Sequence, residues 1–336
     1  MRKSDAARIA ALLRPASHIL ITAHRDPDGD SIGCQMAFHE YWTTQKKGTA
    51  DIVDHGSLPR KYRFLDPDGL FRSPQQIKKK GRRTPWDAVV VFECSSLDRI
   101  GSVQSLLTDG LPIVNLDHHR QNSKFGTVNV LDPTAAACGE MLYDLLRFWK
   151  AQITPTMARQ LAAAIVTDTG RFHYHSTTPR TLKLTAELMR LGADLTNLTD
   201  QIYYSYKVNE FRLVQHVLGN AQLKADGKVC LLTLRAADRR RFGVPMRELE
   251  GLVEYTLYLR GVRVGALLKE VGPSRTKVSL RSTDSSDVSE IARHFGGGGH
   301  FNASGCTIEL PLNRAAAALT RVIGPLRGRP KPRHAD

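Results

Sequence analysis

The stretch HILITAHRDPDGDSIG, residues 18–33, joins a short apolar segment to a turn that is rich in candidate metal ligands. Residues 18–23 are apolar and partly β-branched, which predicts a buried strand. The polar turn from His24 to Asp30 follows directly, and a helical pattern begins at Ile32. This order of strand, polar loop and helix is typical of an α/β sheet, in which ligands bind at the carboxyl ends of the strands.

The same alternation continues through the first half of the chain. Further strands are expected at 50–53, 88–92, 112–116 and 127–130. Helices are expected at 32–45, 97–107, 135–149, 156–166 and 178–191. Continuous apolar strands that alternate with helices predict a parallel sheet in an α/β domain.

The pattern changes after a helical stretch at about 194–218, which contains no Gly or Pro and suggests a connector. Beyond it, strands are expected at 229–234, 262–271 and 277–281, and helices near 245–258, 287–294 and 312–323. We therefore expect a second, smaller α+β domain, which agrees with a length of 336 residues at about 150 residues per domain.

The composition excludes several classes of protein. With 41% hydrophobic and 24% charged residues, the chain is neither disordered nor fibrous. No apolar run approaches the roughly 20 residues that span a bilayer, so no membrane partner is expected. Its five cysteines are far apart and form no CxxC pair, which indicates reduced thiols and a cytoplasmic protein. The net charge of +15 favours anionic partners such as nucleic acid or nucleotides.

Acidic and histidine side chains follow several of the predicted strands and helices. A histidine and two carboxylates in HRDPDGD offer ligands for Mn²⁺, Mg²⁺ or Zn²⁺, although an ordinary turn explains this segment alone equally well. Similar candidates close two other strands and one helix: Glu93, the run Asp117-His118-His119, and Asp168. Together they predict a pair of divalent ions, an arrangement that catalyses phosphoester hydrolysis.

A glycine-rich segment, GGGGHFNASG at 296–305, is the candidate substrate site of the second domain. Glycines let the main chain approach a ligand and turn N–H groups toward an anion. Arg281, at the end of a predicted strand, can supply a bidentate phosphate contact. The segment is not a Walker A loop, because no Lys-Ser/Thr follows it.

Taken in order, HRDPDGDSIG, the acid at 93, DHH at 117–119, VTDTG at 166–170 and GGGGHFNASG resemble the DHH phosphoesterase superfamily, in its branch with a DHHA1 domain. The resemblance implies a parallel-sheet catalytic DHH domain at 1–192, a helical connector at 193–219, a nucleotide-binding α+β DHHA1 domain at 220–325 and a basic tail at 326–336. It also implies hydrolysis of very short oligonucleotides to 5′-mononucleotides, with 3′-phosphoadenosine 5′-phosphate as a further substrate.

The resemblance assigns roles to individual residues. His24 and Asp28 would hold one Mn²⁺, while Asp30, His118 and Asp168 would hold a second. Mg²⁺ or another divalent ion is the alternative. Glu93 would bridge the two ions, His119 would contact the scissile phosphate, and Asp117 would orient a histidine. The substrate-binding positions of the second domain would be Arg281, Gly297, Gly298, Gly299, His300 and Ser304.

One position departs from the family pattern, which usually has Asp where this chain has Glu93. The favoured interpretation is an adapted enzyme that still bridges its metals. The alternatives are a hydrolase of cyclic or linear dinucleotide signals and a catalytically weak nucleotide-binding sensor whose metal pair is spoiled by Glu93. Inorganic pyrophosphatase activity is disfavoured, and a homodimer is left open.

Overall fold

The chain divides into two compact units, residues 1–205 and 206–336. The computed structural model describes residues 1–79, 86–245, 251–283, 286–299 and 301–324. The expected connector at 193–219 holds two helices: α7 (Leu195–Tyr203), which packs on α5 in the first unit, and α8 (Val208–Gly219), which belongs to the second. The expected tail at 326–336 and the candidate His300 lie outside the described residues.

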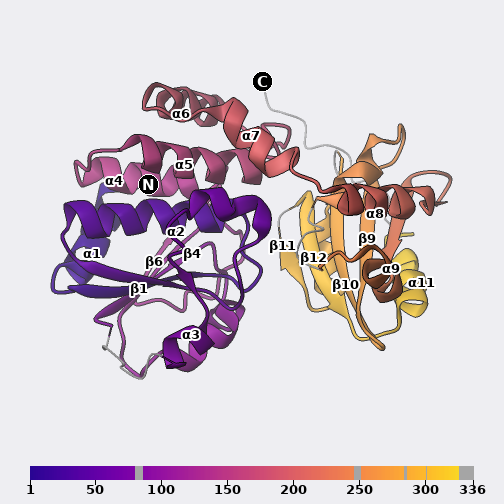
Figure 1. Ribbon diagram of the computed structural model, residues 1–336, viewed down its shortest axis with the longest axis horizontal. Helices are drawn as coiled ribbons and strands as arrows, with labels where there is room; N and C mark the ends of the chain where they lie inside the picture. The colour runs from indigo at the N-terminus through magenta and orange to yellow at the C-terminus, as the bar shows by residue number, and fades with distance from the viewer. Residues whose placement is uncertain (80–85, 246–250, 284–285, 300, 325–336) are drawn as a thin grey trace. The chain divides into compact units, whose positions relative to one another are not determined.

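The first unit is built on a six-stranded parallel sheet in the order β3-β2-β1-β4-β5-β6 (Figure 1). Its strands are β1 (His18–Ala23), β2 (Thr49–Val53), β3 (Phe71–Arg72), β4 (Ala88–Phe92), β5 (Ile113–Asp117) and β6 (Val128–Leu131). The strand order reverses at the neighbouring strands β1 and β4. Their carboxyl ends therefore flank a topological switch point, where open α/β sheets bind ligands.

Helices cover both faces of this sheet (Figure 1). One face carries α1 (Lys3–Leu13), α2 (Gly29–Glu40), α4 (Cys138–Phe148) and α5 (Pro155–Asp168). The opposite face carries α3 (Pro74–Lys79) and the 3₁₀ segment η3 (Leu97–Leu106). Ile19 and Ile21 of β1 point into the first layer and Leu20 into the second, so β1 is buried on both sides.

Three further segments complete the first unit. The π-helical turn η1 (Tyr41–Gln45) continues α2, and the 3₁₀ turn η2 (Arg60–Leu65) precedes β3. Helix α6 (Pro179–Arg190) packs against α5 and forms an outer layer (Figure 1). The predicted helix at 97–107 is a 3₁₀ segment, because Gly101 adopts a positive φ of 62° that interrupts a regular helix.

Glycines let α2 lie unusually close to α5. A Cβ at Gly33 would lie 2.3 Å from the carbonyl oxygen of Gln160, and one at Gly29 would lie 2.4 Å from the side chain of Thr167. A larger residue at either position would push the two helices apart. This close packing sets the distance between Asp30, in the first turn of α2, and the carboxyl end of α5.

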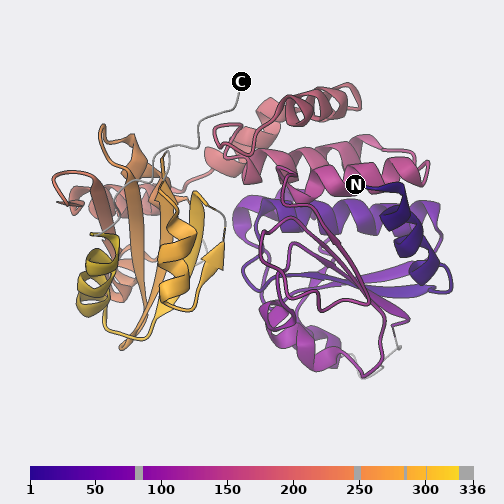
Figure 2. The ribbon, with the colours of Figure 1, turned by 180° about the vertical axis from the view of Figure 1, so that it is seen from behind.

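The second unit contains a mixed sheet in the order β11-β12-β10-β9-β8-β7. Its strands are β7 (Gln222–Lys224), β8 (Val229–Leu234), β9 (Val264–Gly272), β10 (Arg275–Ser282), β11 (Gly298–Gly299) and β12 (Ala303–Ile308). One face packs on α10 (Val288–His294) and α11 (Leu312–Ile323), as Figure 2 shows. The other packs on α8, α9 (Ala236–Phe242) and the 3₁₀ segment η5 (Leu252–Tyr258).

The predicted fold class is confirmed, with a parallel sheet in the first unit and a mixed sheet in the second. The short elements β3, β7 and α9 were not predicted as such, because two to seven residues give no readable period. Among the described residues, no helix has the length and apolarity needed to cross a membrane. All five cysteines are buried free thiols.

Candidate metal centre

The polar turn after β1 places three candidate ligands at the start of α2. Asp28 is the N-cap of α2, and its Oδ1 accepts the main-chain N–H groups of Asp30 at 3.1 Å and Ser31 at 3.0 Å. Such caps satisfy otherwise unpaired N–H groups of the first turn. His24 begins this turn, directly after β1, and is buried, with its Nε2 3.4 Å from Glu93 Oε2.

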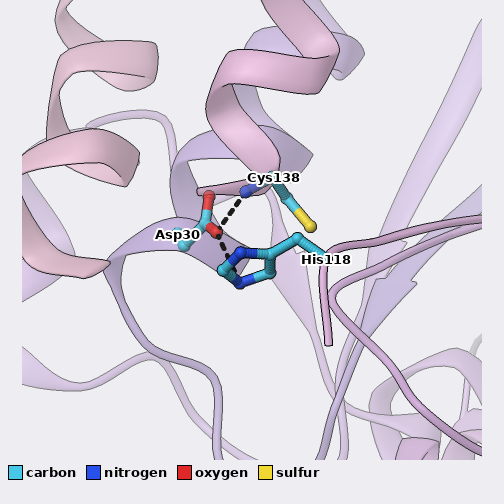
Figure 3. A group of neighbouring side chains, drawn as sticks. All are labelled: Asp30, His118 and Cys138. Carbon is cyan, nitrogen blue, oxygen red and sulfur yellow. Dashed lines mark hydrogen bonds and ion pairs between the residues drawn. The ribbon is translucent and has the colours of Figure 1, made fainter. Parts of the chain in front are cut away.

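Asp30 is fully buried and fastened to the start of α4 (Figure 3). Its Oδ2 accepts the main-chain N–H of Cys138 at 2.6 Å, and its Oδ1 accepts that of Gly139 at 2.9 Å. The buried Cys34 thiol also donates to Oδ1, at 3.4 Å. These donors fix the carboxylate rigidly opposite the His118 ring, whose Nε2 lies 3.8 Å from Asp30 Oδ2.

The His118 ring has a defined orientation. Its Nδ1 lies 3.1 Å from the carbonyl oxygen of Ala135, which can only accept, so Nδ1 carries a proton that it donates. Nε2 then points toward Asp30 and toward Asp168 Oδ2, which is 3.4 Å away at the end of α5. A histidine that binds metal usually donates its other ring N–H in this way.

Glu93 follows β4 directly and is almost completely buried. Its φ of 52° lies in the left-handed region, which is uncommon for a residue with a Cβ. The main-chain N–H of Glu93 donates to the carbonyl of Leu116 at 2.9 Å, so the residue remains tied to the end of β5. Its Oε2 accepts the hydroxyl of Ser31 at 2.6 Å, across 62 positions of sequence.

Asp117 ends β5 and holds the second histidine of the DHH motif. Its Oδ1 lies 2.7 Å from His119 Nδ1 and 3.2 Å from the His119 main-chain N. Its Oδ2 accepts the amide of Asn122 at 2.7 Å. Burial raises the pKa of Asp117, but the hydrogen bonds from His119 and Asn122 and the charges of His119 and His118 together outweigh burial and hold the pKa below its usual value. The ionised Asp117 therefore accepts a hydrogen bond from His119 Nδ1–H. The other ring nitrogen of His119, Nε2, then points away from Asp117.

The crowded carboxylates perturb one another. Burial and the neighbouring charge of Glu93 raise the pKa of Asp28 to about 7. Burial, with the charges of Glu93 and Asp168, raises the pKa of Asp30 well above its usual value. Burial also raises the pKa of Glu93, but the hydrogen bond and charge of His24, with the charges of His119 and His118, together outweigh burial and hold that pKa well below its usual value. The cluster therefore contains more acid than its histidines can neutralise.

Among the described residues, four overlapping groups have ligand atoms within 4.8 Å of one another. We call His24, Asp28 and Glu93 the first ligand group, and Asp30, Glu93, His118 and Asp168 the second. The other two, Asp30 with His118 and Cys138 and Glu93 with His118 and His119, each share two residues with the second group. Buried carboxylate oxygens and imidazole nitrogens that face each other across 3.4 to 3.8 Å suit a divalent cation, which would relieve the repulsion among the acids. Glu93 belongs to both the first and the second ligand group, so the donor set fits two ions that share one carboxylate.

The substrate residues expected in the second unit lie around β10, β11 and β12. Arg281 pairs in register with Ala303, and Gly299 pairs with Ser304. The guanidinium of Arg281 donates through Nε to Glu254 Oε1 at 3.1 Å. Gly299 has a φ of 138°, and a Cβ there would lie 2.6 Å from the carbonyl oxygen of Ala303. Part of the glycine run is thus a short strand rather than an open loop.

The sequence analysis missed several residues that support the site, among them Ser31, Asn122, Cys138 and Gly139. Ser31 and Asn122 act through side-chain bonds to Glu93 and Asp117, while Cys138 and Gly139 act through their main-chain N–H groups. Ser31 lies inside the motif HRDPDGDSIG, so its proximity to the candidate ligands could have been inferred from the sequence. The main-chain donors at Cys138 and Gly139 could not be predicted, because a main-chain N–H group does not depend on the residue type.

Both units match known families. Residues 18–167 match the model described as DHH family, N-terminal domain, and residues 226–324 match the DHHA1 domain. The chain belongs to the DHH family and is an enzyme of the phosphoesterase class.

Particular relatives can be named. The chain is similar to the bifunctional oligoribonuclease and PAP phosphatase NrnA of Thermus thermophilus, with 30% identity over 88% of this chain and 86% of the relative. It is 28% identical to the NrnA of Bacillus subtilis, over 86% of this chain and 89% of that protein. The crystal structure of an exopolyphosphatase-related protein from Bacteroides fragilis has the same fold, with a TM-score of 0.85, 21% identity and 96% coverage of both chains.

Proposed function

We propose that this enzyme hydrolyses very short oligonucleotides to 5′-mononucleotides and removes the 3′-phosphate from 3′-phosphoadenosine 5′-phosphate. The observation that carries the proposal is the cluster of two ligand groups joined by Glu93 at the switch point of the sheet. Support comes from the similarity to proteins named oligoribonuclease and PAP phosphatase over most of both chains. The net charge of +15 would attract such short anions.

We assign two Mn²⁺ ions to the cluster. His24 and Asp28 would hold one, while Asp30, His118 and Asp168 would hold the other, with Glu93 contributing to both. Two such ions supply Lewis-acid stabilisation of the phosphate charge and lower the pKa of the attacking water. The interpretation as a catalytically weak sensor has less support, because the Glu93 carboxylate lies within reach of both ligand groups.

The residues beside the cluster would position the phosphate. His119 would direct Nε2 toward a phosphate oxygen, because its Nδ1–H is held by Asp117 at 2.7 Å and Asp117 is itself held by Asn122. Fixing the ring beforehand removes the entropy of orienting it during the reaction. In the second unit, Arg281, Gly297–Gly299, His300 and Ser304 would bind the nucleotide.

The test is a product profile from metal-stripped protein that is reloaded with Mn²⁺. Labelled oligonucleotides of two to five residues and 3′-phosphoadenosine 5′-phosphate are the substrates. We expect stepwise release of 5′-mononucleotides from the first set and of inorganic phosphate from the second. Asp168→Asn should abolish both reactions, while Asp109→Asn, which changes an exposed carboxylate before β5, should leave them unchanged. Folded wild-type protein that binds Mn²⁺ but releases neither product would contradict the proposal.

The remaining expectations stay predictions. A cytoplasmic location is expected from the widely spaced cysteines of the sequence, and whether the chain forms a homodimer is still open. Size-exclusion chromatography with light scattering would decide the oligomeric state.

A further inference from the structure

The hydroxyl of Ser31 lies within hydrogen-bond distance of every member of the first ligand group. Ser31 lies in the first turn of α2 and is completely buried. Its Oγ is 2.6 Å from Glu93 Oε2, 3.0 Å from His24 Nε2 and 3.1 Å from Asp28 Oδ1. These three neighbours form the first ligand group, so one small side chain contacts every member of it.

A hydroxyl has one proton, so only one of these neighbours can receive it. The shortest contact is with Glu93 Oε2, and 2.6 Å is the length of a charge-assisted O–H···O⁻ bond. The Ser31 main-chain N–H already donates to Asp28 Oδ1 at 3.0 Å, so Asp28 does not depend on the hydroxyl. The geometry therefore directs the Ser31 proton to Glu93.

The position of the Glu93 carboxylate depends on a side-chain donor more than the positions of the Asp28 and Asp30 carboxylates do. The main chain of Glu93 turns through the left-handed region, with a φ of 52°, which is uncommon for a residue with a Cβ. Three side-chain torsions separate its main chain from its carboxylate. Asp28 and Asp30 have two torsions, and each accepts two main-chain N–H groups. A longer, freely rotating carboxylate is positioned poorly unless a donor selects one rotamer.

We propose that Ser31 is a positioning residue that holds the Glu93 carboxylate where it contributes to both ligand groups. The proposal rests on the proposed function only in so far as the cluster binds metal ions. In the Ser31–Glu93 pair the Ser31 hydroxyl holds the longer Glu93 side chain so that its carboxylate can belong to both ligand groups.

The proposal has a measurable consequence for metal affinity. Loss of a side chain that orients a ligand typically weakens metal binding by about 10- to 100-fold. We expect Ser31→Ala to weaken Mn²⁺ binding by that factor. Glu93→Asp withdraws the carboxylate by one C–C bond of about 1.5 Å, which breaks the 2.6 Å contact from the other side. In that background Ser31→Ala should change Mn²⁺ affinity by less than about threefold, because the partner is already lost.

The experiment is a double-mutant cycle read by calorimetric titration of metal-stripped protein with Mn²⁺. It compares the wild type, Ser31→Ala, Glu93→Asp and the double variant. Thr22→Val is the matched control, because Thr22 also donates a buried hydroxyl to a carboxylate, Asp54 Oδ1 at 3.3 Å, outside both ligand groups. Electron paramagnetic resonance on the same samples reports whether two Mn²⁺ ions share a ligand, through their spin coupling.

We expect weaker binding and lost spin coupling in Ser31→Ala, wild-type affinity in Thr22→Val, and no further loss in the double variant. Equal losses from Ser31→Ala in the wild-type and Glu93→Asp backgrounds would overturn the proposal, because Ser31 would then act on the start of α2 alone. Unchanged affinity in Ser31→Ala would overturn it as well. Ser31→Gly replaces the alanine variant if the latter does not fold. No substrate enters these measurements, so a failed hydrolysis assay and a failed cycle are separate results.

Discussion

Asp30 lies in the proposed metal centre and also accepts main-chain hydrogen bonds from α4, and a comparison with Asp168 separates the two effects. In the proposed centre it binds one ion, as Asp168 does, but it also accepts two main-chain N–H groups from the start of α4. Asp30→Ala should therefore lower both metal affinity and the stability of the metal-free protein. Asp168→Ala should lower metal affinity with a smaller loss of stability, because the Asp168 side chain is 16% exposed whereas that of Asp30 is completely buried.

The magnitude follows from the buried donors. Alanine at position 30 leaves the N–H groups of Cys138 and Gly139 buried without their acceptor, at about 1–3 kcal/mol each. The summed loss of about 2–6 kcal/mol is an upper range, since removing Asp30 also relieves its repulsion from Glu93 and Asp168. For Asp168→Ala we expect a loss within about 1 kcal/mol.

Urea unfolding in the presence of a chelator measures this difference. The three tryptophans, Trp42, Trp86 and Trp149, all lie in the first unit, so their fluorescence reports its unfolding specifically. A parallel Mn²⁺ titration should show impaired binding in both variants. The same midpoint and slope in urea for Asp30→Ala and Asp168→Ala would show that Asp30 does not support α4, and wild-type Mn²⁺ binding by Asp30→Ala would show that it does not bind the ion.

Three other predictions concern the pKa of Asp28, the close packing of α2 on α5 at Gly33, and the orientation of His119 by Asp117. The pKa of Asp28 is raised to about 7 in the metal-free fold, so the stability that protonated Asp28 contributes is lost as the pH rises through 7. Mn²⁺, in contrast, binds the ionised form of Asp28. Mn²⁺ should thus raise the melting temperature more at pH 8 than at pH 6, and an equal rise at both values would argue against this pKa. Gly33→Ala should destabilise the first unit by about 1–3 kcal/mol in urea, since its Cβ would meet the carbonyl of Gln160 at 2.3 Å; unaltered stability would mean that α2 and α5 separate freely. Asp117→Asn should lower kcat/KM on the order of 10- to 100-fold with Mn²⁺ content retained, because His119 loses its charged partner. Full activity in this variant would show that Asp117 does not need to orient His119.

The sequence predicts the sheet and the placement of most candidate ligands for a physical reason. Apolar runs such as 88–92 identify buried parallel strands, and polar residues directly after them must emerge at one edge of the sheet. His24, Glu93 and Asp117 could therefore be expected near one another. Their roles as metal ligands or catalytic residues remain proposals.

The rest of the site could not be predicted, because it depends on packing between distant segments. Nothing local to position 31 indicates that its hydroxyl meets Glu93, 62 residues away. The support of Asp30 by the start of α4 comes from main-chain groups at Cys138 and Gly139, which any residue but proline could supply. The glycine of the DGD turn looks like a turn former, yet a Cβ at Gly29 would collide with Thr167 of α5.

The proposed phosphoesterase needs two ions at one cluster. This requirement is measured by following hydrolysis of a labelled dinucleotide while metal-stripped protein receives Mn²⁺ in fractions of an equivalent. We expect little turnover up to one equivalent of Mn²⁺ per chain and a steep rise to a plateau at two equivalents. Full turnover at one equivalent, or turnover without added metal, would rule out a requirement for two ions.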